Sequence, residues 1–135
     1  MPIERAAIVT HNASYVCAEG GGGRELVANR SQKGPWEIFR FEWLSQAGPD
    51  RGTVALVAMN GQYVCAENGG GRELVANRDA IGEWETFRYM WWPEDKISLQ
   101  TADSSYVCAE NGGGRELVAN RPGIGEWEKF SLEQA

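Results

Sequence analysis

Residues 63–87 read YVCAENGGGRELVANRDAIGEWETF, and this stretch decides the fold because the chain contains it three times. Residues 106–121 repeat residues 63–78 letter for letter, and residues 15–30 differ only at Gly20, where the other copies have asparagine. Each copy continues to a Trp-Glu-x-Phe motif, which begins at Trp36, Trp84 and Trp127. A period of about 20 to 50 residues is typical of repeat architectures, so the fold has to be read from this unit.

The residue pattern of each copy predicts four strands separated by turns. In the second copy the strands are expected at residues 53–59, 63–67, 73–77 and 84–91. The corresponding ranges are 6–10, 15–19, 25–29 and 36–43 in the first copy, and 97–101, 106–110, 116–120 and 127–132 in the third. No segment has a sustained helical period, so we predict an all-β fold. Three four-stranded units are too few for a propeller of about four to eight blades, and a closed barrel with pseudo-three-fold symmetry fits better.

Length and charge limit the possible classes of protein. The 135 residues fit a single domain, 1–135, with repeats at approximately 1–46, 47–93 and 94–135. A net charge of −6 argues against nucleic acid as a partner, because Lys and Arg must neutralise phosphates there. We expect no membrane partner either, since no apolar run is long enough to cross a bilayer. The start of the chain lacks the apolar stretch of a secretory signal, so the sequence leaves the compartment open.

The repeat contains one insertion, and each copy contains one cysteine. The copies begin 48 residues apart (Tyr15 to Tyr63) and then 43 residues apart (Tyr63 to Tyr106), and residues 46–52 account for the difference. We expect this insertion to form a surface loop. The three cysteines, Cys17, Cys65 and Cys108, take the same place in each copy, so the symmetry should hold them apart and unpaired. We interpret them as small buried or half-buried residues.

The repeat resembles that of fascin-like β-trefoil domains. The likeness lies in Tyr-Val-Cys-Ala-Glu, the Gly-rich turn, Leu-Val-Ala-Asn and Gly-x-Trp-Glu-x-Phe, and it covers nearly the whole chain. The chain looks most similar to the single trefoils appended to bacterial glycoside hydrolases, carbohydrate-binding module family 92, and less similar to fascin, an actin bundler of several trefoils. The resemblance implies a trefoil of twelve strands with three equivalent surface pockets. It also implies a secreted protein, as part of a larger bacterial enzyme.

The repeated residues divide into a predicted core and a predicted site. Apolar positions suffice for a core: Val16, Ala18, Leu26, Ala28 and Phe39, with their equivalents Val64, Ala66, Leu74, Ala76 and Phe87. Because the phenylalanine of Trp-Glu-x-Phe is the better core residue, the tryptophan is left to face outward as a platform for a pyranose ring. The alternative is that tryptophan caps the open end of the barrel. We favour the platform.

Polar residues beside each tryptophan complete the candidate site. The glutamate after the tryptophan can accept hydrogen bonds from sugar hydroxyls. The preceding Asn-Arg pair either satisfies backbone groups of the turn or reads hydroxyls, and the sequence does not decide between these. The candidate carbohydrate-binding residues are Trp36, Glu37, Asn29 and Arg30, then Trp84, Glu85, Asn77 and Arg78, and finally Trp127, Glu128, Asn120 and Arg121.

Other chemistry finds little support. The glycine runs lack the Lys-Ser/Thr and the helix start of a phosphate loop, so we interpret them as tight turns. The glutamates and arginines that flank those turns are interpreted as cross-strand ion pairs. His11 is the chain's one histidine, so neither a histidine triad nor a histidine metal site can recur in the repeats. We therefore expect no catalytic residues, no metal and no cofactor.

The predicted function is non-catalytic binding of a polysaccharide by three shallow, equivalent sites. The resemblance makes a β-1,3- or β-1,6-glucan the leading ligand, with a galactan such as carrageenan as an alternative. A protein-interaction module, including an actin binder of the fascin type, is the alternative from a different class. We expect a monomer, excised from a multidomain glycoside hydrolase.

Overall fold

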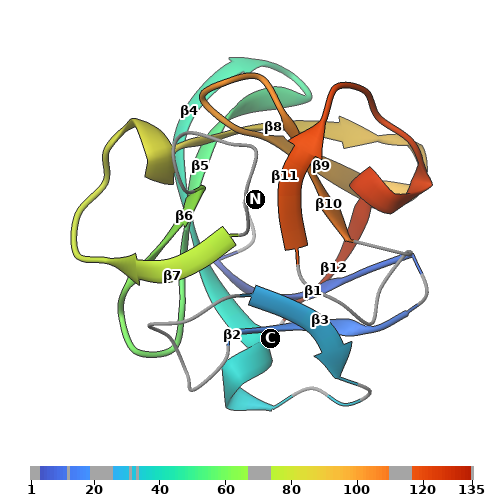
Figure 1. The fold of residues 1–135 in the computed structure, drawn as a ribbon. Helices are drawn as coiled ribbons and strands as arrows, with labels where there is room; N and C mark the ends of the chain where they lie inside the picture. The colour runs from blue at the N-terminus through green and yellow to red at the C-terminus, as the bar shows by residue number, and fades with distance from the viewer. Residues whose placement is uncertain are drawn as a thin grey trace.

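The computed structural model describes residues 4–11, 13–18, 26–30, 32, 34–66, 74–109 and 117–134, and Figure 1 shows its fold. The glycine runs and their flanking Glu and Arg residues lie outside this described part, so the predictions for them stay predictions. Among the described residues, no helix is long and apolar enough to span a membrane.

The strands fall into three groups of four, one group for each copy of the repeat. The first group is β1 (Arg5–Val9), β2 (Tyr15–Ala18), β3 (Leu26–Arg30) and β4 (Ile38–Gly48). The second group is β5 (Arg51–Val57), β6 (Tyr63–Ala66), β7 (Leu74–Arg78) and β8 (Phe87–Trp92). The third group is β9 (Lys96–Gln100), β10 (Tyr106–Ala109), β11 (Leu117–Arg121) and β12 (Phe130–Gln134).

The first and last strands of the groups form a closed barrel. Antiparallel pairing runs from β1 to β4, β5, β8, β9 and β12, and β12 pairs with β1 to complete the ring. The second and third strands form three hairpins, β2–β3, β6–β7 and β10–β11. Strands β3, β7 and β11 contact one another and surround a central axis in Figure 1. A six-stranded barrel with three such hairpins is a β-trefoil, which confirms the predicted fold class.

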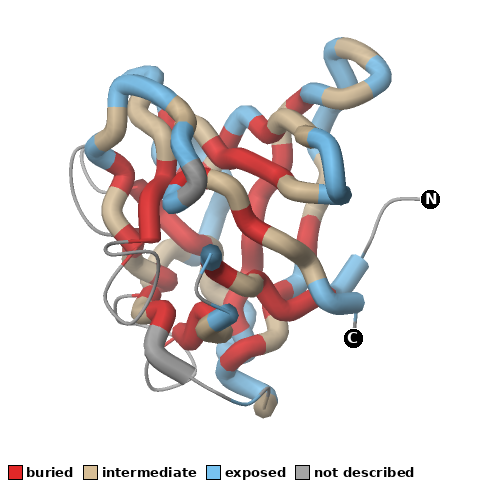
Figure 2. Tube along the Cα trace, turned by 90° about the vertical axis from the view of Figure 1, so that its right-hand side faces the viewer, coloured by how far each residue is buried: buried red, intermediate tan, exposed pale blue. Residues whose placement is uncertain are grey.

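The core contains the apolar residues that the repeat predicts. The side chains of Val16, Leu26 and Phe39 are fully buried, as are Ala18, Ala28 and the equivalents of all five in the second copy. Buried segments run through the interior in Figure 2, with exposed segments at the turns. Full burial of one such side chain stabilises the fold by about 1.5 to 3 kcal/mol. The three cysteines are also buried as predicted, and they are present as thiols.

Aromatic side chains join the first two units at the barrel. The ring of Trp43 lies 5.0 Å from Tyr89 and 6.3 Å from Trp91, centroid to centroid. Trp92 donates from Nε1 to Ser98 Oγ at 2.9 Å, and Lys129 Nζ lies 4.7 Å from its ring centroid. The contact between Trp43 of the first unit and Trp91 of the second therefore lies between units.

Two predictions about local structure are wrong. Residues 46–52 do not form a loop, because β4 and β5 continue through them and pair up to Gly48 and Arg51, which leaves a turn at Pro49 and Asp50. This long hairpin stands at the top of Figure 1. A Cβ on Gly52 would lie 2.1 Å from the carbonyl oxygen of Ser45, so the two strands approach closely only because residue 52 is glycine.

The second correction concerns the tryptophans, which do not begin strands. Each lies in a short 3₁₀ turn, and the turns are η2 (Pro35–Glu37), η4 (Glu83–Glu85) and η7 (Glu126–Glu128). The following strands begin one or two residues later, at Ile38, Phe87 and Phe130. Alternation of apolar and polar residues resembles a strand here, although the backbone first makes one turn of helix. A further 3₁₀ turn, η5 (Pro93–Asp95), connects β8 to β9.

Candidate carbohydrate-binding site

Each tryptophan turn is closed by its own glutamate. Glu85 is buried, and its Oε1 accepts a hydrogen bond of 2.6 Å from the backbone N–H of Gly82. Glu37 accepts in the same way from Gly34 at 2.6 Å. A Cβ on Gly82 would lie 3.0 Å from that oxygen, which is tighter than ordinary contact. The spacing Gly-x-Trp-Glu is therefore a requirement of the turn, because glycine lets the carboxylate approach and glutamate satisfies the backbone donor.

In the second and third copies, the second oxygen of the glutamate faces an arginine from the preceding strand. Arg78 Nε lies 3.6 Å from Glu85 Oε2, and Arg121 Nε lies 3.8 Å from Glu128 Oε2. Arg78 also donates from Nη1 to Asn77 Oδ1 at 2.7 Å. The third copy repeats this bond, from Arg121 to Asn120 at 2.6 Å. In the second and third copies, the structure thus brings together the Glu, Arg and Asn that the sequence predicts for one site.

The polar residues of the site differ in how easily a ligand hydroxyl could reach them. Glu85 is 6% exposed and both of its oxygens are engaged, so a sugar hydroxyl would have to displace Gly82 N–H or Arg78 to reach it. Asn77 uses its oxygen for Arg78 and is half-buried, whereas its side-chain N–H groups make no hydrogen bond to the described residues. Asn120 likewise uses its oxygen for Arg121, its N–H groups make no hydrogen bond to the described residues, and its side chain is exposed. The amide is therefore the better placed group for a ligand hydroxyl.

The first copy is described less completely. Glu37 is buried at 6% exposure and closes its turn like the others. The side chains of Asn29 and Arg30 lie outside the described part of the chain, and so does that of Glu126 in the third copy. The prediction that Asn29 and Arg30 join the first site stays a prediction.

The tryptophan side chains face solvent, in agreement with the sequence analysis. Trp36 is 41% exposed, and Trp84 and Trp127 are each 37% exposed, whereas Phe87 two residues beyond Glu85 is completely buried. A tryptophan that capped the barrel end would instead be covered. An indole with more than a third of its surface in water offers an apolar face of the kind that stacks on a sugar ring.

Two equivalent depressions lie beside two of these turns, and the sequence analysis missed them. One, of about 570 Å³, lies between η2 with Arg40 and the turn at residues 58–61, between β5 and β6 of the next copy. The other, also about 570 Å³, lies between η4 with Arg88 and Thr101, between β9 and β10 of the third copy. Neither is lined by a tryptophan ring. The sequence signal for these depressions is the arginine after the phenylalanine of Trp-Glu-x-Phe, which is present as Arg40 and Arg88 in the first two copies. In the third copy this position is Ser131.

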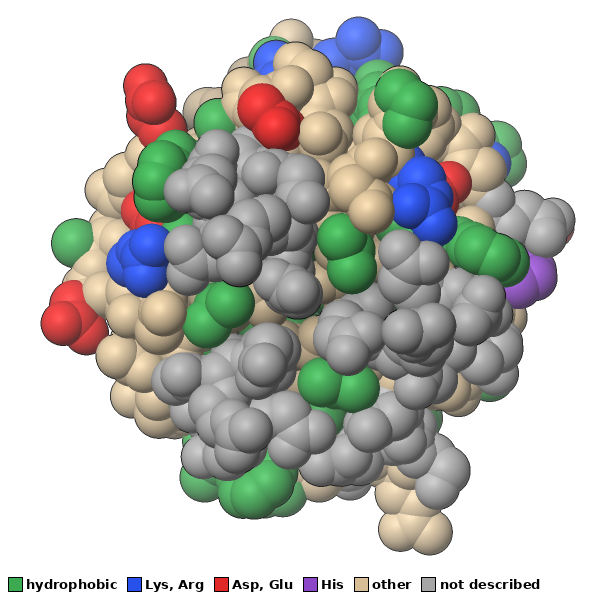
Figure 3. Space-filling model, viewed as in Figure 1, with side chains coloured by type: hydrophobic (Ala, Val, Ile, Leu, Met, Phe, Trp, Pro, Cys, Tyr) green, Lys and Arg blue, Asp and Glu red, His purple; other side chains and the backbone are tan. Residues whose placement is uncertain are grey.

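Charges of both signs occur on the face of the trefoil that carries the β2–β3, β6–β7 and β10–β11 hairpins. Figure 3 shows acidic and basic side chains dispersed around this face, with hydrophobic groups between them. Among the described residues, no group of three or more His, Cys, Asp or Glu side chains could hold a metal ion. The described groups of the site are thus an exposed indole, a neutral amide and an arginine next to a buried carboxylate.

Comparisons with known proteins give structural matches alone. No protein-family model matches the chain, and no curated protein sequence matches it. The structure is similar to a designed three-fold symmetric protein, ThreeFoil, with a TM-score of 0.82 at 15% identity, covering 97% of this chain and 99% of that one. It is similar to SeviL bound to the asialo-GM1 saccharide, with a TM-score of 0.75 at 18% identity and 99% of each chain covered.

The Rhizoctonia solani agglutinin is also similar, with a TM-score of 0.75 at 12% identity, over 100% of this chain and 97% of that one. At such identities the likeness shows the fold alone. It agrees with the trefoil derived from strand pairing.

Proposed function

We propose that the chain is a non-catalytic carbohydrate-binding module that uses three equivalent sites to bind a polysaccharide. The observation that carries the proposal is the exposed tryptophan, which recurs in the same 3₁₀ turn of all three copies. A single exposed apolar residue is normal on a protein surface, so it is the recurrence of an exposed indole at the same place in all three copies that supports the proposal. Two of the structurally similar proteins, one bound to a saccharide and one an agglutinin, support carbohydrate as the class of ligand.

In this proposal the residues of one site have separate roles. Trp84 stacks on the apolar face of a pyranose, and Asn77 with Arg78 donates hydrogen bonds to its hydroxyls. Glu85 holds the tryptophan turn through Gly82 and orients Arg78, because its oxygens are already engaged. The third site has the same contacts, and the first is proposed to follow the same plan. Shallow contacts of this kind give weak single sites, and a polymer that engages several of them at once gains affinity by avidity.

A glucan with β-1,3 or β-1,6 linkages is our proposed ligand, and a galactan is the alternative. This choice rests on the resemblance of the repeat to family 92 modules and fascin-like trefoils, which itself remains a proposal. The same resemblance suggests that the module works in a larger secreted enzyme. An actin-binding role of the fascin type is less suitable, because bundling needs two different faces and the three tryptophan turns are alike.

The test is retention on an affinity gel that contains soluble or insoluble glucans and galactans. Trp84→Ala alone should weaken retention modestly, since two sites remain, and the triple change Trp36→Ala, Trp84→Ala and Trp127→Ala should abolish it. Leu44→Ala is the matched control, because Leu44 is 42% exposed on the β4–β5 hairpin, away from the three turns. An unchanged circular dichroism spectrum would show that the triple variant is folded.

Two results would overturn the proposal. The triple variant could keep full retention, which would place binding elsewhere. The unmodified protein could bind no glucan or galactan while it co-sediments with filamentous actin, which would favour the protein-interaction alternative.

A further inference from the structure

Tyr106 differs from its two equivalents in the hydrogen bonding of its hydroxyl group. The first residue of each YVCA strand is Tyr15, Tyr63 or Tyr106. Tyr15 donates from its hydroxyl to Glu133 Oε1 at 2.8 Å, and Tyr63 donates to Glu42 at 3.1 Å. In both pairs the glutamate belongs to the unit before the tyrosine, counted around the barrel. The hydroxyl of Tyr106 makes no hydrogen bond to the described residues.

A single substitution accounts for the difference. The position of Glu42 and Glu133 is taken by Met90 in the second copy, and Met90 cannot accept the hydrogen bond as a carboxylate does. In the first copy, Glu42 also forms an ion pair with Arg40. It therefore connects a guanidinium to a tyrosine hydroxyl. The equivalents of both partners are kept, Arg88 in the second copy and Tyr106 in the third, without the acid between them.

Arg88 consequently has no carboxylate partner among the described residues. Its Nη2 donates to the carbonyl oxygen of Thr101 at 3.2 Å and to Ser104 Oγ at 3.1 Å, and neither acceptor carries charge. Arg88 is exposed, so its side chain can turn at little cost.

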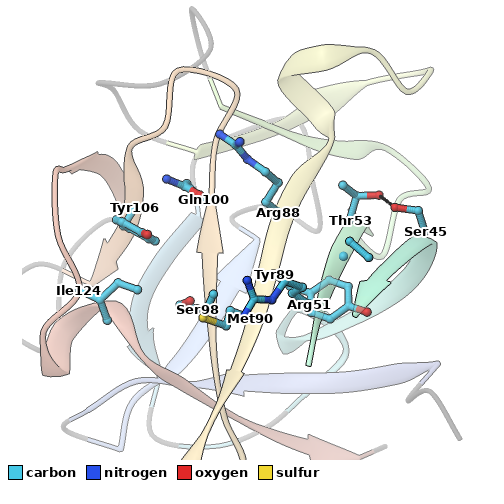
Figure 4. Close-up of a pocket in the computed structure, with 12 residues that line it drawn as sticks. Ser45, Arg51, Thr53, Arg88, Tyr89, Met90, Ser98, Gln100, Tyr106 and Ile124 are labelled. Atoms are coloured by element: carbon cyan, nitrogen blue, oxygen red, sulfur yellow. Dashed lines mark hydrogen bonds between the residues drawn. The ribbon is translucent and has the colours of Figure 1, made fainter. Parts of the chain in front are cut away.

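A pocket opens where this acid is absent. It measures about 280 Å³ and is lined by side chains from the β4–β5 hairpin, β8, β9 and β10. In Figure 4, Tyr106 and Ile124 lie on one side, Arg51 and Thr53 on the other, and Met90 between them. Its described lining includes two arginines, Arg51 and Arg88, and no carboxylate side chain. The volume is near the lower end of small-molecule sites, which hold about 300 to 1,000 Å³.

The pocket cannot recur in the other two units. One wall is the extended β4–β5 hairpin, which pairs with β8 through Arg51 opposite Met90 and Gly52 opposite Tyr89. The insertion that lengthens this hairpin occurs once in the chain. The pocket is therefore unique to this part of the barrel, and none of the three platform tryptophans lines it.

We propose that this pocket binds a compact carboxylate carried on a six-membered ring, such as a uronic acid residue or an aromatic acid. The ligand's carboxylate lies over Met90 and takes the part that Glu42 plays in the first copy. It accepts a hydrogen bond from Tyr106 and pairs with Arg88, which are charge-assisted contacts of the stronger kind. The ring packs against Met90, Ile124 and the edge of Tyr89.

The test follows the methyl resonances of Met90 and Ile124 by proton–carbon NMR while small probes are added. Methyl β-glucuronide and benzoate represent the sugar and the aromatic source of the carboxylate, and methyl β-glucoside is the same ring without charge. We expect saturable shifts with at least one carboxylate and weaker or no shifts with the glucoside. Equal binding of glucoside and glucuronide, or no shift with either carboxylate, would overturn the proposal.

A substitution taken from the protein's own repeat sharpens the test. Met90→Glu restores the acid that the other two units have, so the variant should fold and should fill its own site. Affinity for the carboxylate should fall about tenfold or more, because the new side chain competes for Tyr106 and Arg88. Tyr106→Phe should also weaken binding, whereas Tyr63→Phe should leave it unchanged. Unaltered affinity in Met90→Glu would contradict the assignment.

The outcome is separable from that of the proposed function. The variant that lacks all three platform tryptophans should keep these pocket shifts, even where it no longer binds a polysaccharide. Loss of the shifts in that folded variant would show that the pocket is not an independent site, and would overturn this inference alone.

Discussion

The tryptophan turn occurs in all three copies, whereas the tyrosine–glutamate contact occurs at two of three equivalent places, and the two features differ in how their partners are supplied. Each turn is built from residues close in sequence: in η4, Gly82 and Glu85 hydrogen-bond within three positions. Tyr15 and Tyr63 instead bond a residue of another unit, as Tyr15 bonds Glu133 across 118 positions. Local contacts are copied together with the repeat. Contacts between units can be lost by one substitution, and Met90 is such a case.

The largest expected effect concerns the contrast between buried and exposed aromatic residues within one turn. Phe87→Ala should reduce the free energy of unfolding by about 3 to 5 kcal/mol, because it leaves a cavity in the core. Trp84→Ala should reduce it by less, about 1 to 2 kcal/mol, since 37% of that side chain is already exposed to solvent and no core cavity is left. Urea denaturation measures both. A large loss for Trp84→Ala would mean that the indole is part of the core packing, against the platform role.

A second prediction concerns the unique hairpin. Gly52→Ala should destabilise the protein by about 1 to 3 kcal/mol, because the new methyl group collides with the carbonyl of Ser45. Gly48→Ala is the control in the same hairpin, since a Cβ there meets no atom closer than 3.5 Å. Thermal unfolding of both variants gives the comparison. Equal stability would show that the strands at Gly52 can separate freely.

The third prediction concerns how the turn is closed. Glu85→Gln keeps an acceptor for Gly82 N–H but removes the charge that Arg78 faces. The loss in stability should be about 1 kcal/mol, whereas Glu85→Ala should cost about 1 to 3 kcal/mol because a backbone donor loses its partner. Polysaccharide retention should weaken in both variants at the second site alone. If Glu85→Gln retains full stability and loses binding at the second site completely, the glutamate contacts the ligand directly.

The smallest expected effect separates the tyrosines by their acid partners. The pKa of Tyr15 is raised chiefly by its hydrogen bond to Glu133, and that of Tyr63 is raised first by burial and then by Glu42. These contacts stabilise the neutral phenol, so they act fully below the tyrosine's unfolded pKa and are lost as pH rises through the raised folded value. Ultraviolet difference absorbance follows the ionisation.

Matched substitutions test the order of causes. Glu133→Gln should lower the pKa of Tyr15 more than Glu42→Gln lowers that of Tyr63, because burial of Tyr63 persists after the acid is removed. The reverse order would contradict the assigned causes.

Much of the fold could be predicted because the repeat is short and its core positions are apolar in every copy. Leu26, Phe39 and their equivalents indicate three similar β units, and the twelve-stranded trefoil followed from the resemblance to fascin-like domains. The 3₁₀ turn at Trp84 was missed, because alternating residues such as Glu-Trp-Glu-Thr-Phe also suit a strand. The insertion at residues 46–52 contains Gly and Pro and suggests a loop, yet pairing with β8 holds it in a hairpin.

The candidate sites were predicted only in part, for a related reason. The tryptophans and their Glu, Arg and Asn neighbours are close in sequence, so their association could be inferred. The depressions beside Arg40 and Arg88 lie between consecutive units, and the pocket at Tyr106 combines residues from all three. A pattern within one repeat carries no information about which side chain the next repeat places opposite it.

The central claim, three equivalent sites, is tested most directly by calorimetric titration with a short gluco-oligosaccharide that cannot bridge two sites. The account predicts about three equivalents per chain at similar weak affinity, and tighter binding with cross-linking for the long polymer. The first site is expected to be the weakest, because Pro35 and Gly20 replace the Glu and Asn of the other copies. A single equivalent, or none with tryptophan fluorescence unchanged by any glucan or galactan, would contradict it.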